Sequence, residues 1–312
     1  MSEHTDTVLA ALRNAPGFEG VARDNCRVTR LGGLTNLVHM VDTGQQRVVV
    51  RIPGEGTETY IDRAVELANA RAAHRAGVSP EVLWADAARG VMITRAIDGI
   101  VTMTPDLFAA RPGSPERAGQ ALARLHRSGE TFEFRFELFS MIEDYLDLLG
   151  GKDVTLPEGY HDIVRAAEPV KAALAANPAP LAPCHCDPLC ENFLDDGKVM
   201  WIVDWEYSGM NDPLWDVGDL SVEAGMDAAA EAELLRGYFG REPDAAETGR
   251  VVIYKAMCDL LWTLWGLIQL ANGNEAEDFQ AYADGRFARC RAEMAGPRFA
   301  ESLRVLNAAP AR

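Results

Sequence analysis

The segment HCDPLCENFLDDGKVMWIVD runs from His185 to Asp204 and places polar residues at fixed spacing around an apolar run. It has the pattern H-x-D-x-x-x-x-N, then a spacer typical of a hairpin, then MWIV before the last aspartate. We expect a strand, a loop and a second strand here. Phosphoryl transfer from a magnesium nucleotide to an alcohol requires a carboxylate near the acceptor hydroxyl and oxygen ligands for the metal. The order of Asp187, Asn192 and Asp204 predicts such a site.

Each of these residues also has an ordinary structural explanation. An aspartate before Pro188 favours a turn, an asparagine is common in loops, and an aspartate often ends a buried strand. Singly, each is more often structural than catalytic. Together, in this order and around two strands, they favour a metal–nucleotide site.

The composition is that of a soluble globular protein. Apolar residues make up 48% and charged residues 25% of the 312 residues, enough for one large or two medium domains. No uncharged apolar run is long enough to span a membrane, and residues 1–20 lack the basic start and apolar core of a secretion signal. We therefore expect a cytoplasmic protein without membrane insertion.

The chain is strongly acidic, with 47 acidic against 30 basic side chains and a net charge of −17. This balance disfavours nucleic-acid phosphates and anionic membranes as partners, and it favours a small cationic molecule. Solubility alone is the other explanation of the charge. The sequence leaves the oligomeric state open, with a homodimer as one alternative.

Three of the six cysteines, Cys184, Cys186 and Cys190, crowd the segment quoted above. Structural zinc sites pair their ligands at short spacing and need four of them, and no second pair lies nearby. Small buried thiols are therefore the favoured interpretation. Disulfides are not expected in a reducing compartment.

The first hundred residues have a mixed α/β pattern. Residues 27–53 predict three strands with Gly44 at a hairpin, residues 62–75 predict a helix ended by Gly77, and residues 78–97 predict two more strands. From about Asp98 the chain is mostly helical. Ser114 is a candidate helix cap with Pro115 after it, and His126 near that helix's end is expected to be structural. Further helices are predicted near 137–149, 160–176, 227–239 and 246–271.

This order of elements predicts an α+β fold with two lobes. Residues 1–96 would form a small antiparallel-sheet lobe that binds the nucleotide, and residues 97–312 a larger, mostly helical lobe that carries the catalytic and substrate sites. The cleft between two lobes is the usual ligand site.

The small lobe offers candidate nucleotide ligands between its strands. Glycines at a strand turn let backbone amides approach phosphate oxygens, although a Gly-Gly pair is most often a simple turn. Arg51 ends the run VVVR, and Glu66 follows on the predicted helix, as in the ion pair of kinases, with an ordinary salt bridge as the alternative. An arginine in this position can engage phosphate through its planar fork. Residues 93–96 are expected to connect the lobes and to meet an adenine. The nucleotide candidates are Arg51, Glu66, Gly33, Thr35, Asn36 and Ile93.

Two tryptophans, Trp262 and Trp265, are three residues apart and so share one face of a predicted helix. Stacked aromatic faces with carboxylates nearby recognise a trimethylammonium group. An aromatic stripe packed in a helical core is the alternative.

With these segments in place, the chain resembles the choline/ethanolamine kinase family, within the wider group of aminoglycoside-phosphotransferase-like kinases. The resemblance covers roughly residues 28–290. Its motifs are GGLTN, VVVRIPG with IDRAVE, HCDPLCEN, IVDWEYSGMNDPLWDVGDLSVE, and DLLWTLWGLIQ with AYADGR. It departs from the family at Pro188, Cys190 and Ala228, where polar or aromatic residues are usual.

The resemblance implies a protein-kinase-like fold, ATP and Mg²⁺ as cofactors, and a role for each matching residue. Asp187 would be the catalytic base, Asn192 and Asp204 would hold the metal, and Arg51 with Glu66 would face the nucleotide phosphates. The residues implied for the acceptor pocket are Asp187, Glu206, Tyr207, Glu223, Trp262, Trp265 and Tyr282.

We therefore expect a kinase that phosphorylates the hydroxyl of a small cationic amino alcohol, with choline as the leading candidate. Ethanolamine, an aminoglycoside or a thiamine-like alcohol are alternative acceptors on the same fold. A non-catalytic protein that binds choline or nucleotide is the alternative from another class.

Overall fold

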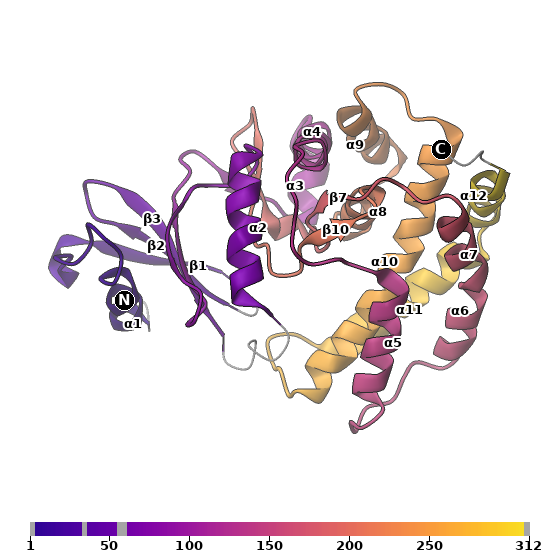
Figure 1. Ribbon diagram of the computed structural model, residues 1–312, viewed down its shortest axis with the longest axis horizontal. Coiled ribbons are helices and arrows are strands. Elements are labelled where there is room, and N and C mark those ends of the chain that lie inside the picture. Colours follow the sequence, from indigo (N-terminus) through magenta and orange to yellow (C-terminus); the bar gives the residue numbers. More distant parts are fainter. Residues whose placement is uncertain (1–3, 33–35, 55–60, 309–312) are drawn as a thin grey trace.

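The computed structural model describes residues 4–32, 36–54 and 61–308, and it has two lobes (Figure 1). The small lobe is a five-stranded antiparallel sheet in the order β1-β2-β3-β5-β4, with α1 and α2 on opposite sides of it. Its elements are α1 (Thr5–Leu12), β1 (Arg27–Gly32), β2 (Asn36–Asp42), β3 (Arg47–Pro53), α2 (Arg63–Arg75), β4 (Val82–Asp86) and β5 (Val91–Arg95), with a short 3-10 turn at Arg23–Asn25.

Strand β3 shows why the sheet faces two different environments. Side chains alternate along a strand, so Val48 and Val50 point to the same face. Both are fully buried and pack with Leu9 of α1 in the small-lobe core. Arg51 is in the opposite phase, and therefore its side chain projects toward α2 and the large lobe.

Helix α2 begins and ends where its sequence predicts. The Asp62 carboxylate accepts hydrogen bonds from the backbone N–H groups of Ala64 and Val65, which caps the first turn. The helix ends at Arg75, and Gly77 follows with a φ of 74°, a conformation that glycine adopts without strain.

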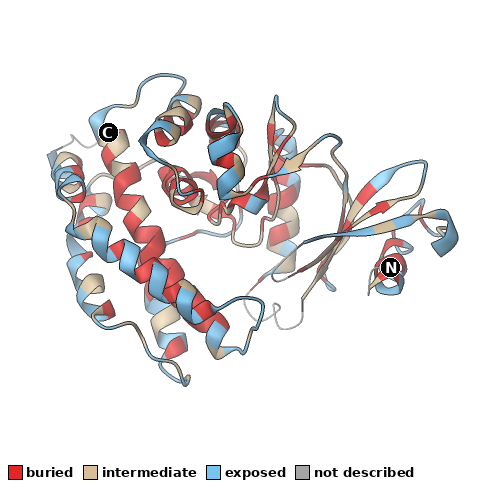
Figure 2. Ribbon diagram, turned by 180° about the vertical axis from the view of Figure 1, so that it is seen from behind, coloured by how far each residue is buried: buried red, intermediate tan, exposed pale blue. Residues whose placement is uncertain are grey.

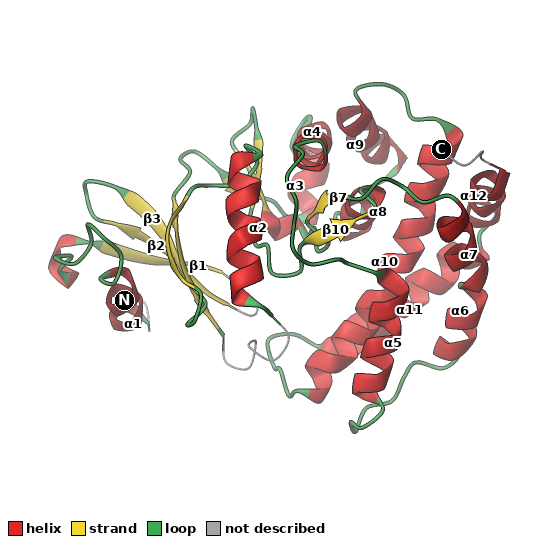
Figure 3. Cartoon of the chain, viewed as in Figure 1, coloured by secondary structure: helices red, strands yellow, loops and turns green. Residues whose placement is uncertain are grey.

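The large lobe is mainly helical (Figure 3). A three-stranded sheet in the order β6-β8-β9 and a two-stranded sheet of β10 and β7 lie on the side that faces the small lobe. The strands are β6 (Val101–Thr102), β7 (Ala182–Cys184), β8 (Phe193–Asp195), β9 (Met200–Ile202) and β10 (Gly209–Asn211). The helices are α3 (Pro105–Ala110), α4 (Ser114–His126), α5 (Leu138–Leu149), α6 (Tyr160–Ala166), α7 (Glu168–Ala176), α8 (Leu214–Glu223), α9 (Ala228–Phe239), α10 (Ala245–Ala271), α11 (Phe279–Ala295) and α12 (Pro297–Ala308).

Helix α10 is the central element of the large lobe. By length and composition it could cross a membrane, but 89% of its most apolar window is buried inside the protein, as in the core helix of a globular fold (Figure 2). Helix α8 crosses it closely, because a Cβ added at Gly218 would meet the Val251 backbone oxygen at 3.0 Å. One residue further along α8, Asp219 accepts a hydrogen bond from Trp262 in the second half of α10.

The predicted two-lobed α+β architecture is confirmed, and so are the helices at 114–126, 137–149, 227–239 and 246–271 to within a residue or two. The predicted helix at 160–176 is two helices, because Pro169 lacks the N–H that a continuous helix needs. Ser114 does not cap α4, since its hydroxyl donates instead to the backbone oxygens of Phe108 and Arg111. The boundary at residue 96 stays a prediction: β5 ends at Arg95 and β6 begins at Val101.

Candidate active site

Two of the three residues that the sequence singled out, Asp187 and Asn192, lie between β7 and β8, and the third, Asp204, follows β9. Asp187 is half-buried at the start of the loop after β7, and a 3-10 turn at Cys190–Asn192 leads into β8. The Asn192 side-chain amide donates to the Asp187 backbone oxygen at 3.1 Å, and the Val203 N–H donates to the Asn192 backbone oxygen at 3.0 Å. Because β8 and β9 pair as neighbours, this contact sets Asp204 next to Asn192. These contacts bring Asp187, Asn192 and Asp204 close together along the backbone, and their convergence on one metal ion stays a prediction.

His185 ties this loop to β9. Its Nδ1 accepts a hydrogen bond from the Asp187 N–H at 3.3 Å, and its Nε2 lies 2.9 Å from the Val203 backbone oxygen. The second contact requires a proton on Nε2, so the two bonds together define one neutral tautomer. Burial lowers the pKa of His185, which also favours the neutral ring. His185 therefore fixes the position of the loop relative to the residue that follows β9.

Asp216 at the start of α8 holds the same loop from the other side. It accepts hydrogen bonds from the N–H groups of His185 at 2.7 Å and Cys186 at 2.8 Å, and the Trp215 indole donates to the Cys186 backbone oxygen at 3.0 Å. Cys186 has a φ of 68°, a left-handed conformation that costs on the order of 1 kcal/mol or more for a non-glycine residue. Such a backbone persists only when its surroundings hold it, and Asp216 and Trp215 do so.

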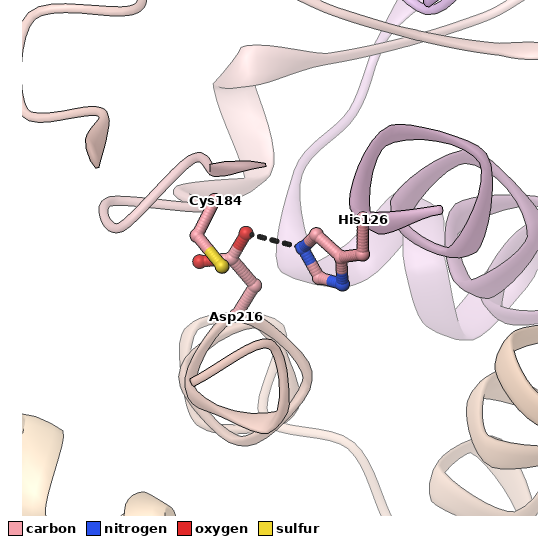
Figure 4. A group of neighbouring side chains, drawn as sticks. All are labelled: His126, Cys184 and Asp216. Atoms are coloured by element: carbon pink, nitrogen blue, oxygen red, sulfur yellow. Dashed lines mark hydrogen bonds and ion pairs between the residues drawn. The ribbon is translucent and has the colours of Figure 1, made fainter. Parts of the chain in front are cut away.

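A buried histidine orients Asp216 in turn. His126, from the end of α4, points toward the Asp216 carboxylate, with Nε2 at 2.9 Å, while its Nδ1 lies 3.0 Å from the Tyr238 hydroxyl (Figure 4). The expectation that His126 is a satisfied structural residue is confirmed. Together with Cys184 of β7, His126 and Asp216 form a group of three, and the atoms that could bind a metal lie within 4.8 Å of one another.

The group of His126, Cys184 and Asp216 has the properties of a hydrogen-bonded network that supports the loop, and not those of a metal centre. Burial and the nearby Asp216 raise the pKa of the Cys184 thiol well above its usual value, so the sulfur keeps its proton. The thiol donates to the Asn211 backbone oxygen at 3.6 Å. Cys186 and Cys190 are also buried, with thiol pKa values raised mainly by burial.

A network of ion pairs joins α2, β3 and the residues that follow β9. The Arg51 guanidinium contacts Glu66 of α2, and its Nη1 also lies 3.5 Å from Asp204 Oδ1 and 3.3 Å from Glu206 Oε1. Burial alone would lower the pKa of Arg51, but Glu66 and the two large-lobe carboxylates raise it. The predicted pair of Arg51 and Glu66 is thus present and is shared with the large lobe.

Arg63, which the sequence reasoning missed, completes this network. It is the first residue of α2, and its Nη1 donates to Glu66 Oε2 at 2.9 Å and to Glu206 Oε1 at 2.6 Å. The Asn36 side-chain amide donates to the same Glu206 oxygen at 2.7 Å. The position i,i+3 from Glu66 was the available signal.

The acidic residues of this network fit a hard divalent cation. Carboxylate oxygens of Glu66, Asp204 and Glu206 lie within 4.8 Å of one another. Asp204 has a φ of 70°, and its buried Oδ1 makes no hydrogen bond. Burial, and then Glu206, raise the pKa of Asp204 well above its usual value. A cation here would relieve this crowding of negative charge, and oxygen donors are the ligands that Mg²⁺ prefers.

The structure places some expected residues elsewhere. Ile93 lies inside β5, paired with Val50 and Trp84 on its two sides, and its side chain is fully buried in the small-lobe core. The expectation that residues 93–96 form the connection between the lobes is wrong for the first three of them, because the β-branched run continues the sheet as β5 up to Arg95. Gly33 and Thr35 lie outside the described residues. Glu206, expected in the acceptor pocket, contacts the small-lobe residues named above.

The four aromatic residues expected around the acceptor do lie together. Ring centroids are 6.0 Å apart for Tyr207 and Trp262 and 5.7 Å apart for Trp265 and Tyr282, and the Trp265 indole donates to the Tyr207 hydroxyl at 3.0 Å. Phe279 packs on Trp265 at 5.7 Å and was not predicted. Trp262 is only 3% exposed, whereas the other three expected rings are half-buried.

Arg286 of α11 lies among these rings and was also missed. Its guanidinium contacts Glu223 and sits 4.9 Å from the centroid of the Tyr282 ring, and its Nη1 lies 3.1 Å from Asp259 Oδ1. Glu223, expected in the acceptor pocket, is therefore already paired with a cation. Ala228, at the first position of α9, is exposed.

The charges around this ring cluster shift the pKa of the candidate base. Burial, and then the nearby Glu223, raise the pKa of Asp187 to about 7, with Arg286 acting in the opposite direction. A carboxylate with this pKa takes up and releases a proton near neutral pH. Asp187 is thus close enough to act electrostatically both on Tyr282 of the ring cluster and on Asp204 of the acidic cluster.

Comparison with known proteins agrees with this geometry. Residues 27–248 match the sequence model of the phosphotransferase enzyme family. A crystal structure of a choline/ethanolamine kinase family protein from Mesorhizobium loti is 60% identical, with a TM-score of 0.90 over 98% of this chain and 99% of that one. Choline kinase LicA from Streptococcus pneumoniae is 27% identical, with a TM-score of 0.74 over 86% and 93% of the two chains. Ethanolamine kinase 1 from Mus musculus is 24% identical, covering 82% of this chain and 80% of the relative. These matches confirm the resemblance that the motifs indicated.

Proposed function

The chain belongs to the phosphotransferase enzyme family, and from that membership we propose that it transfers the γ-phosphoryl group of ATP to the hydroxyl of choline. It is an ATP-dependent alcohol kinase of the choline/ethanolamine kinase type. The observation that carries the choline proposal is the aromatic group of Tyr207, Trp262, Trp265 and Tyr282 beside the candidate base.

In this proposal, Asp187 accepts the proton of the acceptor hydroxyl. As the hydroxyl oxygen forms its bond to the γ-phosphorus, the bond from that phosphorus to the leaving oxygen of ADP breaks, and the proton passes to the carboxylate. The raised pKa of about 7 supports this role, because the carboxylate is substantially ionised at neutral pH and is still basic enough to hold a proton. The fixed loop around Cys186 keeps the base in position.

The nucleotide side of the site uses the network between the lobes. Arg51 and Arg63 would face the phosphates, with Glu66 and Glu206 orienting both guanidinium groups. Asn192 and Asp204 would hold Mg²⁺, with Glu206 close enough to take part. Bound Mg²⁺ would supply charge neutralisation at the phosphate oxygens.

The acceptor side would hold the ammonium head between ring faces. A cation over a Trp or Tyr ring gains about 0.5–2 kcal/mol per contact, and carboxylates nearby add Coulomb attraction. Trp265 and Tyr282 are half-buried and so present ring surface, whereas Trp262 is packed in the core and acts mainly as a wall.

Ethanolamine is the second candidate acceptor. The ethanolamine kinase of Mus musculus covers most of this chain, and the exposed Ala228 adds no ring where choline kinases often have an aromatic residue. A primary ammonium also donates hydrogen bonds, which a quaternary one does not.

The proposal is tested by incubating the purified protein with ATP and Mg²⁺ and measuring ADP release with choline, ethanolamine, a thiamine-like alcohol and an aminoglycoside. We expect turnover with amino alcohols, and choline as the preferred acceptor. Turnover with the aminoglycoside alone would contradict the assignment of the pocket, and choline binding without ADP release would indicate a non-catalytic protein.

A further inference from the structure

Asp219 is a fully buried carboxylate, and one of its two oxygens has no hydrogen-bond partner. It lies on α8, and its Oδ2 accepts a hydrogen bond from the Trp262 indole at 3.0 Å. Its Oδ1 has no hydrogen-bond partner, and no basic side chain among the described residues forms an ion pair with it. A buried carboxylate in this state costs several kcal/mol relative to one in water.

No other buried acidic side chain in the described ranges is left without a basic partner. Each of them contacts an arginine, a lysine or a histidine, as is usual for buried charge. These pairs are Glu66 with Arg51, Asp195 with Arg111 and Arg117, Asp212 with Arg250, Asp216 with His126, Glu231 with Lys255, Glu247 with Arg241, and Asp259 with Arg286 and Arg289. Asp219 is therefore the exception, and its location explains why.

Asp219 lies beside the ring cluster and near the candidate base, since the charges of Glu223 and Asp187 both act on it. Its hydrogen-bond donor Trp262 packs on Tyr207, and Glu223 is one helical turn further along α8, on the same face. Among the described residues, Arg286 is the basic side chain whose charge acts on Asp219, and it already forms ion pairs with Glu223 and Asp259. Burial, and then Glu223, raise the pKa of Asp219 well above its usual value, so a cation brought by a ligand would restore its ionised form.

We propose that Asp219 holds the charged amino group of the acceptor, with its free Oδ1 accepting a hydrogen bond from that group. This inference rests on the proposed amino-alcohol kinase activity and deepens it. A protonated primary amine supplies both the positive charge and the N–H donor that Oδ1 lacks. A trimethylammonium group supplies the charge alone, because its methyl groups carry no N–H. Asp219 would thus contribute more to the affinity for a primary amino alcohol than to that for a quaternary one.

The variant Asp219→Asn isolates this role. An asparagine has the same shape, and its oxygen still accepts the Trp262 hydrogen bond, but the negative charge is gone. We expect kcat/KM to fall about 100-fold for ethanolamine and about tenfold for choline, since a hydrogen bond to a charged group adds to the lost attraction in the first case. The KM for ATP stays within about twofold, and the same ranking appears in calorimetric affinities measured without nucleotide.

Thermal unfolding separates binding from a structural role. Removing a buried, uncompensated carboxylate relieves a desolvation cost, so Asp219→Asn is expected to keep or raise the unfolding midpoint. Glu247→Gln is the matched control, because it removes a buried but paired carboxylate about 22 Å along α10 from Trp262. It should lower the midpoint and leave the acceptor KM unchanged.

Two outcomes overturn the inference while leaving the proposed function intact. One is an active wild type whose Asp219→Asn variant keeps its kcat/KM for both acceptors. The other is a variant with a lower unfolding midpoint and equal losses for choline, ethanolamine and ATP, which assigns Asp219 to packing. A wild type that phosphorylates neither amino alcohol contradicts the proposed function itself.

Discussion

Arg63 Nη1 lies 2.6 Å from Glu206 Oε1, so the first residue of a small-lobe helix is bonded to a residue just after the large lobe's β9. The pair is buried, with 9% and 5% of the two side chains exposed. It sets the distance between α2 and the loop that holds Asp204. The lobes are thus joined at the candidate metal site itself.

Loss of this pair should weaken nucleotide binding. In Arg63→Ala, Glu206 loses its shortest hydrogen bond among the described residues, and the carboxylates around Asp204 lose a cation. We expect the KM for ATP to rise about tenfold, with a smaller change in the acceptor KM, measured by steady-state kinetics. Arg75→Ala is the control, because Arg75 also pairs an α2 arginine with a large-lobe glutamate, Glu130, but is 58% exposed. An equal effect of both variants would show that the bond at Glu206 has no special role.

Asp216 should control turnover without contacting any substrate. Asp216→Ala removes the acceptor of two backbone hydrogen bonds and leaves the strained Cys186 conformation unsupported. We expect kcat to fall about 100-fold and stability to fall by about 3 kcal/mol, since the buried donors lose their partner. ATP affinity should change little, as measured by calorimetry. A variant with normal kcat would mean that the loop holds its shape without α8.

Asp187 should set the pH dependence of activity. Its pKa of about 7 predicts that kcat/KM rises with pH and reaches a plateau above about pH 7, because only the ionised carboxylate accepts a proton. Asp187→Asn should lose nearly all turnover and keep nucleotide binding. A wild-type profile that is flat between about pH 5 and pH 9, about two units on either side of the pKa, would contradict this role.

The same pKa predicts that the free energy of unfolding falls as pH rises, whereas kcat/KM rises. The folded protein holds the Asp187 proton up to about pH 7, whereas the unfolded chain releases it near its ordinary value of 3.8. Between these values the folded state binds more protons, so the free energy of unfolding falls as pH rises, by up to about 1.4 kcal/mol per pH unit. Urea unfolding of metal-free protein measures this slope. Asp187→Asn should make the slope shallower, and an unchanged slope would show that other groups cause it.

The two tryptophans of α10 should behave differently when truncated. Trp265 is half-buried and borders the ring cluster, so Trp265→Ala should raise the acceptor KM about tenfold and the ATP KM by much less. Trp262 is buried and bonded to Asp219, so Trp262→Ala should lower the free energy of unfolding by about 3–5 kcal/mol. Kinetics and urea titration measure the two effects. Equal changes in both KM values for Trp265→Ala would place that ring in the core.

The sequence predicted the parts of the site that lie within one short segment or one repeat of a helix. Asp187, Asn192 and Asp204 follow one another around two strands, and the rings of Trp262 and Trp265 share a helix face. Arg51 and Glu66 were predicted as well, because the strand pattern and the helix pattern each fix a direction. These predictions needed only local spacing.

The missed residues depend on contacts between distant segments. Arg63 finds Glu206 across 143 positions, Asp216 meets the loop about 30 positions earlier, and Arg286 meets Glu223 across 63. No local periodicity marks such partners. Ile93 was misplaced because a β-branched run gives no sign of where a strand ends and a connection begins.

The most direct test of the account is a phosphorus NMR measurement on the purified protein with ATP, Mg²⁺ and choline, run beside Asp187→Ala. We predict a phosphocholine signal that grows with ADP in the wild type and is absent in the variant, while both proteins bind the nucleotide. Phosphocholine formed at a similar rate by Asp187→Ala, or ATP left unchanged by the wild type with every amino alcohol, would contradict the account.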